Sequence, residues 1–164
     1  MSARALARWC VTAACALLLA ACATPPRSAP PAGVQQWNGR LALNVEGEAS
    51  RSFSAGFELK GAPESGELTL FNPLGGTLAV LHWTPGTATL RANGQTREFG
   101  SLDELAREAT GAPLPVASLF DWLQGKPTAV AGWQADVSQV AEGRLHARRS
   151  DPPPPADLRL VFER

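Results

Sequence analysis

The 164-residue chain contains no tyrosine, two histidines, one methionine and three cysteines, and its 15 basic side chains match its 15 acidic ones. The balanced charge does not favour the strongly basic surface that nucleic-acid-binding proteins need, so no nucleic acid is expected as a partner. Neither His82 nor His146 has a second His or a Cys at metal-ligand spacing, and we expect no metal site and no cofactor. The sequence also lacks the G-x-S-x-G, H-E-x-x-H, P-loop and G-x-G-x-x-G motifs. These absences favour a binding or structural protein over an enzyme, and no catalytic residue is expected.

The one long apolar run lies at the N-terminus. Residues 1–21 hold 17 apolar side chains, two arginines and no acid. Arg4 and Arg8 precede an apolar stretch of the length that is typical of a secretory signal peptide rather than of a permanent membrane span. Without this segment, 143 residues remain with 13 basic and 15 acidic groups, enough for a single domain with its own core.

The signal peptide ends in Leu-Ala-Ala-Cys at Cys22, which resembles the bacterial lipobox. In a lipobox the cysteine receives a diacylglyceryl group on its sulfur, the leader is removed before it, and the new amino group is acylated. A chance stretch of small residues ending in Cys is the alternative. We expect Cys22 to be the lipidation site. Because Cys10 and Cys15 leave with the leader, no disulfide and no thiol nucleophile remain.

A proline-rich segment follows the lipobox. Residues 22–34 contain four prolines and few apolar side chains, so they predict an extended tether that does not pack. Ala23 directly follows the lipidated cysteine, and the bacterial lipoprotein sorting rule associates a residue other than Asp there with the outer membrane. The remaining residues, 35–164, are expected to form one domain that is tethered to a membrane and not embedded in it.

The domain begins with apolar residues at every second position, which indicates β-strands with one buried face. The first strands are marked by Leu41, Leu43 and Val45, then Phe53, Ala55, Phe57 and Leu59, then Leu68 and Leu70. Residues 78–83 are apolar on both faces, which is typical of a strand covered on both sides. Pro85-Gly86 and Asn93-Gly94 predict tight turns, so consecutive strands are expected to pair antiparallel.

Two helices are expected in the middle of the domain. Ser101 and Glu104 form a capping box at the start of the first, and Gly111 ends it. The second begins near Pro115 and carries apolar residues at helical spacing up to Leu123. Three further strands follow around 133–137, 145–147 and 158–162, with the prolines of 152–155 in the loop before the last strand.

These elements predict a mainly β fold of the α+β type, with about nine antiparallel strands. Such a sheet can curl, with the helices covering its open side, or split into a sandwich. The position of the helix pair between two groups of strands favours a strongly curved sheet, or unclosed barrel, with a helical lid over apolar side chains.

The loop between the third and fourth strands is unusual. Asn72, Pro73 and Gly75 occupy favoured positions of a type I turn, which leaves Leu74 at its tip. Leu74 either folds back onto the strands or stays exposed for contact with lipid. Burying one leucine is worth only about 1.5–3 kcal/mol, so an exposed Leu74 adds little as an anchor beside several acyl chains.

The lipobox, the segment Trp-Asn-Gly-Arg-Leu-Ala-Leu from Trp37, the Leu-Thr-Leu-Phe-Asn-Pro-Leu-Gly segment from Leu68, the Asn93 hairpin and the Leu-Pro helix start at Leu114 occur here in one order. Together they resemble the outer-membrane lipoprotein receptor family LolB. The resemblance implies an unclosed antiparallel barrel with helices over its opening and an apolar cavity between. It also implies that Leu74, with Pro73 beside it, is the membrane-contact loop.

The resemblance further implies a function. Proteins of this family accept triacylated lipoproteins from the periplasmic carrier LolA and place them in the inner leaflet of the outer membrane. The expected partners are therefore LolA, the lipoprotein cargo and outer-membrane phospholipid, and a monomer is expected at the periplasmic face of that membrane. By alternation and helical spacing, the candidates for the acyl cavity are Leu41, Leu43, Phe53, Phe57, Leu68, Leu70, Leu78, Val80, Leu119, Trp122 and Leu123.

Two alternatives remain open from the sequence. Each cavity candidate can instead belong to an ordinary packed core, because periodicity shows which face is apolar but not whether a void lies there. The corresponding alternative function is a structural or scaffolding envelope lipoprotein without an acyl-binding cavity. A lipid hydrolase is less favoured, since no nucleophile and base pair is evident.

Overall fold

The computed structural model describes residues 34–110 and 114–163. The leader expected at 1–21, the lipidation site Cys22 and all of the tether except its last residue lie outside these ranges. In chain order the elements are β1 (Gln35–Val45), η2 (Ala49–Arg51), β2 (Phe53–Gly61), β3 (Gly66–Phe71), β4 (Thr77–Thr84), β5 (Thr87–Ala92), β6 (Gln95–Phe99), α2 (Leu102–Thr110), α3 (Val116–Trp122), β7 (Trp133–Asp136), η3 (Val140–Glu142), β8 (Arg144–Arg149) and β9 (Ala156–Glu163).

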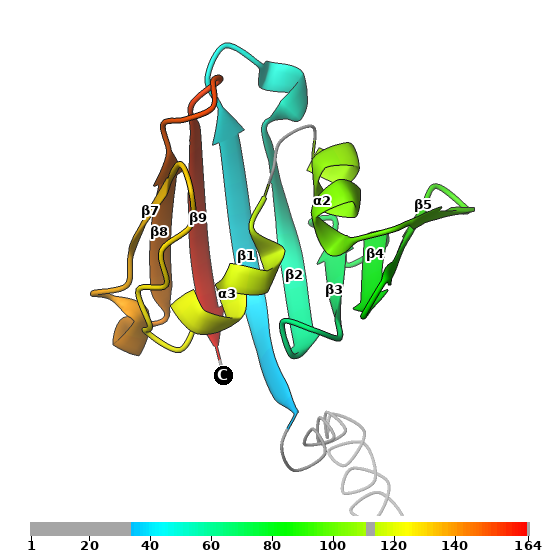
Figure 1. Cartoon of the computed structure of the whole chain (residues 1–164), viewed down its shortest axis with the longest axis horizontal. Coiled ribbons are helices and arrows are strands. Elements are labelled where there is room, and N and C mark those ends of the chain that lie inside the picture. Colours follow the sequence, from blue (N-terminus) through cyan, green and yellow to red (C-terminus); the bar gives the residue numbers. More distant parts are fainter. Residues whose placement is uncertain (1–33, 111–113, 164) are drawn as a thin grey trace, which may run out of the picture.

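The strands form one antiparallel sheet in the order β6-β5-β4-β3-β2-β1-β9-β8-β7. The first strand is central because the last strand returns to pair with its free edge, from Asn38 opposite Glu163 to Val45 opposite Ala156. Within the described residues the edge strands β6 and β7 do not pair with each other, so the sheet is curved but not closed. Figure 1 shows α2 and α3 in front of the same face of this sheet. The curved sheet with helices over one side is thus confirmed against the sandwich.

The tight turns form where the sequence predicts them. Asn93 and Gly94 both have positive φ, at 52° and 74°, as the two central residues of a type I′ hairpin require. Gly86 has φ of 80° after Pro85, in agreement with a type II turn. These short connections explain why β4, β5 and β6 are consecutive neighbours in the sheet.

Both helices are confirmed, with caps that explain their starts. The amide of Glu104 donates to the Ser101 hydroxyl at 3.1 Å, and the Glu104 carboxylate accepts from the amide of Gly100 at 3.1 Å. The second helix starts at Val116, one residue later than the sequence indicates, because Pro115 takes the capping position before it. Among the described residues, no helix combines the length and the apolar character that a membrane crossing requires.

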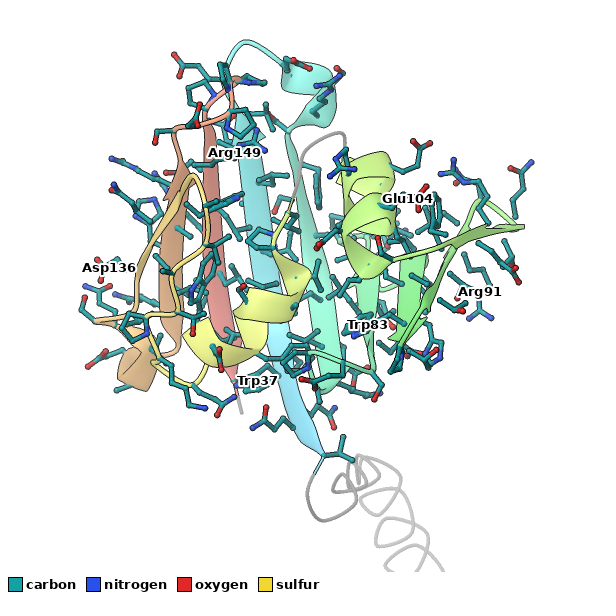
Figure 2. All side chains as sticks on the ribbon, in the orientation of Figure 1. Trp37, Trp83, Arg91, Glu104, Asp136 and Arg149 are labelled. Carbon is teal, nitrogen blue, oxygen red and sulfur yellow. The ribbon has the colours of Figure 1, made fainter. Side chains whose placement is uncertain are left out.

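The helix α3 is held on the sheet by aromatic packing. The Phe120 ring lies edge-on to Trp37 on β1, with ring centroids 5.7 Å apart, and edge-on to Trp83 on β4 at 6.1 Å. Figure 2 shows Trp37 and Trp83 at the same end of the sheet. Phe120 itself is completely buried, so this end of the inner face is solid core.

The outer face of the sheet carries no second layer within the described residues, which corrects the interpretation of β4. This strand was expected to be covered on both sides, yet on its outer face His82 is exposed and Val80 is only half-buried, whereas Leu81 and Trp83 on its inner face are buried. The helices cover only the inner face, and for that reason β4 keeps one open side.

The C-terminal part also follows the expected order. The last three strands are β7, β8 and β9, and residues 152–155 lie in the connection between β8 and β9. The β7 strand ends at Asp136, one residue before the expected limit.

Candidate functional site

A hollow of about 340 Å³ lies between the inner face of the sheet and the helix α2. Its wall consists of Leu41, Phe53, Leu68, Leu70, Leu78, Ala79, Leu81, Leu90, Ala92, Asn93, Arg97, Ala106, Glu108, Ala109, Leu114 and Val116. Thirteen of these sixteen side chains are apolar. The volume is at the lower end of the range of ligand-binding pockets, and the predominantly apolar wall suits an apolar ligand.

Small side chains create this space. Ala79 on β4 and Ala92 on β5 are direct cross-strand partners, and both line the hollow. Ala106 and Ala109 lie on the wall contributed by α2. Under α3 the corresponding volume is filled by the large rings of Trp37, Trp83 and Phe120. The difference in side-chain size between the two ends of the inner face therefore decides where the void lies.

A β-bulge places one more leucine on the wall. The register between β3 and β4 shifts at Leu70, because Leu70 pairs with Ala79 while Phe71 pairs with Thr77. Leu78 is the extra residue, and it lines the hollow together with its neighbour Ala79. Since Leu78 is also 45 % exposed, it lies at the rim, where the hollow meets water.

The polar residues of the wall belong to the rim as well. The Arg97 guanidinium on β6 is 2.7 Å from the carboxylate of Glu108 on α2, so an ion pair joins the hairpin to the helix. Both side chains are about half exposed, and the Arg97 guanidinium also lies 5.7 Å from the Phe99 ring centroid. The site is thus amphipathic, with an apolar interior and a charged edge.

The structure places five of the eleven predicted cavity residues on this wall: Leu41, Phe53, Leu68, Leu70 and Leu78. Leu43 and Phe57 are buried in the core but do not line the hollow. Val80 is half-buried and also does not line it, because the bulge at Leu78 breaks the alternation that groups these two residues in the sequence.

The three candidates from the second helix region, Leu119, Trp122 and Leu123, are almost fully buried and lie outside the hollow. Sequence reasoning missed the four alanines of the wall. The signal that could have found them is a small residue at an inward-facing strand or helix position.

The loop between β3 and β4 holds Leu74 in solvent. The Gly75 amide donates to the Asn72 carbonyl at 2.9 Å, which confirms the predicted turn, and the Asn72 side chain accepts from the amides of Leu74 and Gly76, each at 2.9 Å. Leu74 is 95 % exposed, so it does not fold back onto the strands. Pro73 beside it is exposed too. This loop joins the same two strands that contribute Leu70 and Leu78 to the hollow.

An unclosed antiparallel sheet with helices over an apolar hollow and an exposed apolar loop between β3 and β4 defines the class of a half-open β-barrel domain with an apolar pocket. The model of the family described as "Outer membrane lipoprotein LolB" matches residues 35–152. The chain belongs to this family.

Three proteins called outer-membrane lipoprotein LolB illustrate the similarity. The protein of Cupriavidus necator is 38 % identical over 149 residues, which cover 87 % of this chain and 74 % of the relative. That of Bordetella pertussis is 36 % identical over 172 residues, covering 88 % and 86 %. That of Bordetella petrii is 32 % identical over 171 residues, covering 88 % and 85 %. Family membership makes the chain an outer-membrane lipoprotein with a role in lipoprotein localisation.

Proposed function

We propose that this protein accepts triacylated lipoproteins from the periplasmic carrier LolA and inserts them into the inner leaflet of the outer membrane. The observation that carries the proposal is the pairing of an apolar hollow with the exposed Leu74 on one pair of strands, β3 and β4. The hollow offers a place for acyl chains, and the loop offers a contact with the bilayer. The protein itself is held at the membrane by lipid on Cys22.

Acyl chains drive the transfer in this proposal. Each CH₂ group that leaves water gains about 0.8 kcal/mol, so a chain moves spontaneously towards the environment that buries more of it. A receptor whose cavity fits better than that of the carrier takes the cargo, and the bilayer takes it from the receptor. No nucleotide hydrolysis and no catalytic residue is required, in agreement with a binding protein rather than an enzyme.

The partly apolar rim offers a release route for an acyl chain. Leu78 lines the hollow and reaches solvent, and it lies four residues from Leu74 along the chain. A chain leaving the hollow beside Leu78 would therefore stay close to apolar surface on its way to a membrane touched by Leu74. The charged pair of Arg97 and Glu108 lies on another part of the rim, contributed by β6 and α2.

The test uses a soluble Cys22→Ala form mixed with a purified complex of LolA and a lipoprotein. We expect the lipoprotein to move to the soluble form, as followed by affinity pull-down. If all cargo stays on the carrier, the proposal is wrong. Displacement of a fluorescent fatty acid provides an independent measurement: a scaffolding lipoprotein with a filled core would bind none.

A further inference from the structure

Arg149 on β8 is a buried cation with unused hydrogen-bond donors. Only 2 % of the residue is exposed, and its guanidinium lies 5.8 Å from the Trp133 ring centroid. Its Nη2 donates to the carbonyl of Pro154 at 2.7 Å, whereas Nε and Nη1 are buried and have no partner. Figure 2 shows Arg149 at the end of the sheet opposite Trp37. A buried guanidinium with free donors is costly, because arginine stays protonated and each unsatisfied charged group loses its hydration.

Burial lowers the pKa of Arg149 from its ordinary value, because removal from water disfavours the charged form of the guanidinium. No carboxylate of the described residues forms an ion pair with it. The position therefore has the properties of one half of an anion site.

Arg149 lines two hollows, and charge distinguishes them. The larger, of about 360 Å³, also contains Arg148 but has Glu46 and Asp157 on its wall, so its fixed charges cancel. The smaller, of about 200 Å³, lies between α2 and β8. Its wall contains Arg107 of α2, Arg149 of β8 and a single acid, Asp103, which leaves one net positive charge. An anion is accordingly favoured in the smaller hollow.

The donors indicate which anion fits. Nε and Nη1 lie on different edges of the planar guanidinium, and Arg107 belongs to another element, the helix α2. A carboxylate presents two oxygens in one plane, whereas a phosphate presents oxygens in several directions and can accept from both arginines at once. The rest of the wall is apolar, including Leu114, Pro115 and Val130, so Asp103 is the one wall residue that would repel an anion.

We propose that the hollow between α2 and β8 is a phosphate-binding site in which Arg149 and Arg107 hold the oxyanion. The phosphate is either free or part of a lipid headgroup. Leu114 lines both this hollow and the apolar hollow under α2, so the two sites share a wall, and a phospholipid can use both. The proposal does not depend on lipoprotein transfer, since a triacylated cysteine carries no phosphate.

The test measures binding by titration calorimetry on the soluble Cys22→Ala form at constant ionic strength. The probes are sodium phosphate, dihexanoyl phosphatidylglycerol and, as a lipid without phosphate, dihexanoylglycerol. Arg107→Gln changes an exposed position on α2, and Arg149→Met replaces the buried cation by an unbranched apolar chain that keeps the packing of the arginine stem. Arg91→Gln on β5, an exposed arginine outside both hollows, is the matched control.

We expect saturable binding of at least one phosphate probe, weakened about tenfold or more by Arg107→Gln and by Arg149→Met and unchanged by Arg91→Gln. Binding of sodium phosphate assigns the site to the free ion, and binding of phosphatidylglycerol alone assigns it to a lipid headgroup. Two results overturn the proposal: phosphate binding that survives Arg107→Gln, or equal affinity for the lipids with and without phosphate. Because Arg107 is exposed, its substitution stays informative even if Arg149→Met fails to fold. No cargo is used, so the outcome is independent of lipoprotein transfer.

Discussion

The side chain of Asn72 fixes the backbone of Leu74: its Oδ1 accepts from the Leu74 amide at 2.9 Å and from the Gly76 amide at the same distance. The Asn72 backbone amide also donates to the Gly76 carbonyl at 2.8 Å. With the bond from the Gly75 amide to the Asn72 carbonyl, four hydrogen bonds close the loop around its base, and Leu74 is 95 % exposed. An apolar side chain that its own loop holds in solvent is suited to contact with a second apolar surface, such as that of a membrane.

Leu74→Glu is expected to separate acceptance of cargo from delivery. Stability should change by no more than about 0.5 kcal/mol, because the side chain contacts almost nothing. A carboxylate at this tip resists entry into the bilayer, so cargo should bind normally but remain on the protein in the presence of liposomes. Sedimentation of liposomes with labelled lipoprotein measures delivery.

The matched control for this substitution is Val161→Glu, which places the same charge at a residue that is 61 % exposed on β9. This variant should deliver like the wild type. Equal delivery by both variants would show that the loop is incidental.

Filling the hollow should prevent acyl binding without adding polarity. Ala79→Phe places a ring in the hollow beside Ala92, its cross-strand partner, and we expect the affinity for a fluorescent fatty acid to fall about tenfold. Ala42→Phe is the control, since Ala42 lies on the outer side of β1, between Leu41 and Leu43 that face inwards. Unchanged affinity in Ala79→Phe would place the acyl chain elsewhere.

Gly39, the one glycine of β1, should be highly sensitive to substitution. A Cβ at this position would lie 2.0 Å from the Val161 carbonyl oxygen and 2.7 Å from Cα of Phe162, both backbone atoms of β9. Gly39→Ala is therefore expected to lower the free energy of unfolding by about 2 kcal/mol or more, measured by urea denaturation. Gly100→Ala meets only the Glu104 carboxylate at 3.6 Å and should be nearly neutral; a similar loss in both variants would contradict the steric explanation.

Asp157 on the outer face should control the stability at low pH. Burial opposes its ionisation, but hydrogen bonds with His146 at 2.6 Å and Arg148 at 3.2 Å, together with the charges of His146 and Arg159, outweigh burial and lower the pKa of Asp157. Its contribution is thus fully present above the pKa of about 3.9 that an unfolded Asp has, and it is lost as the pH falls through the lower folded value.

The corresponding measurement is the free energy of unfolding of wild type and Asp157→Asn between pH 2 and pH 6. We expect the variant to be less stable than the wild type at pH 6 and to lose less stability below pH 4. Parallel curves for the two proteins would show that Asp157 does not carry this part of the acid response.

Local patterns in the sequence were sufficient for most elements. The type I′ hairpin at Asn93, the capping box at Ser101 and the alternation in β1 and β2 all act through neighbouring residues, and all three are present in the structure. Alternation failed at Leu78 and Val80 because a bulge depends on the partner strand, which a single sequence does not reveal. The sequence also grouped the core residues Leu119 and Trp122 with the wall residues Leu68 and Leu70, because periodicity shows which face is apolar but not whether a void lies beside it.

By itself, the sequence determined the order of strands and helices, the turn at Asn72 and the family resemblance, because turn chemistry, capping and periodicity are properties of short segments. The tertiary structure decided which apolar residues surround a void, since that depends on how side chains from distant segments fill space: alanines of β4, β5 and α2 leave a hollow, and the rings of Trp37, Trp83 and Phe120 close the other end. It also decided that Leu74 stays in water and that Arg149 is buried beside Trp133 with unused donors. Exposure and burial are relations between elements, so they become defined only when the sheet and its helices have come together.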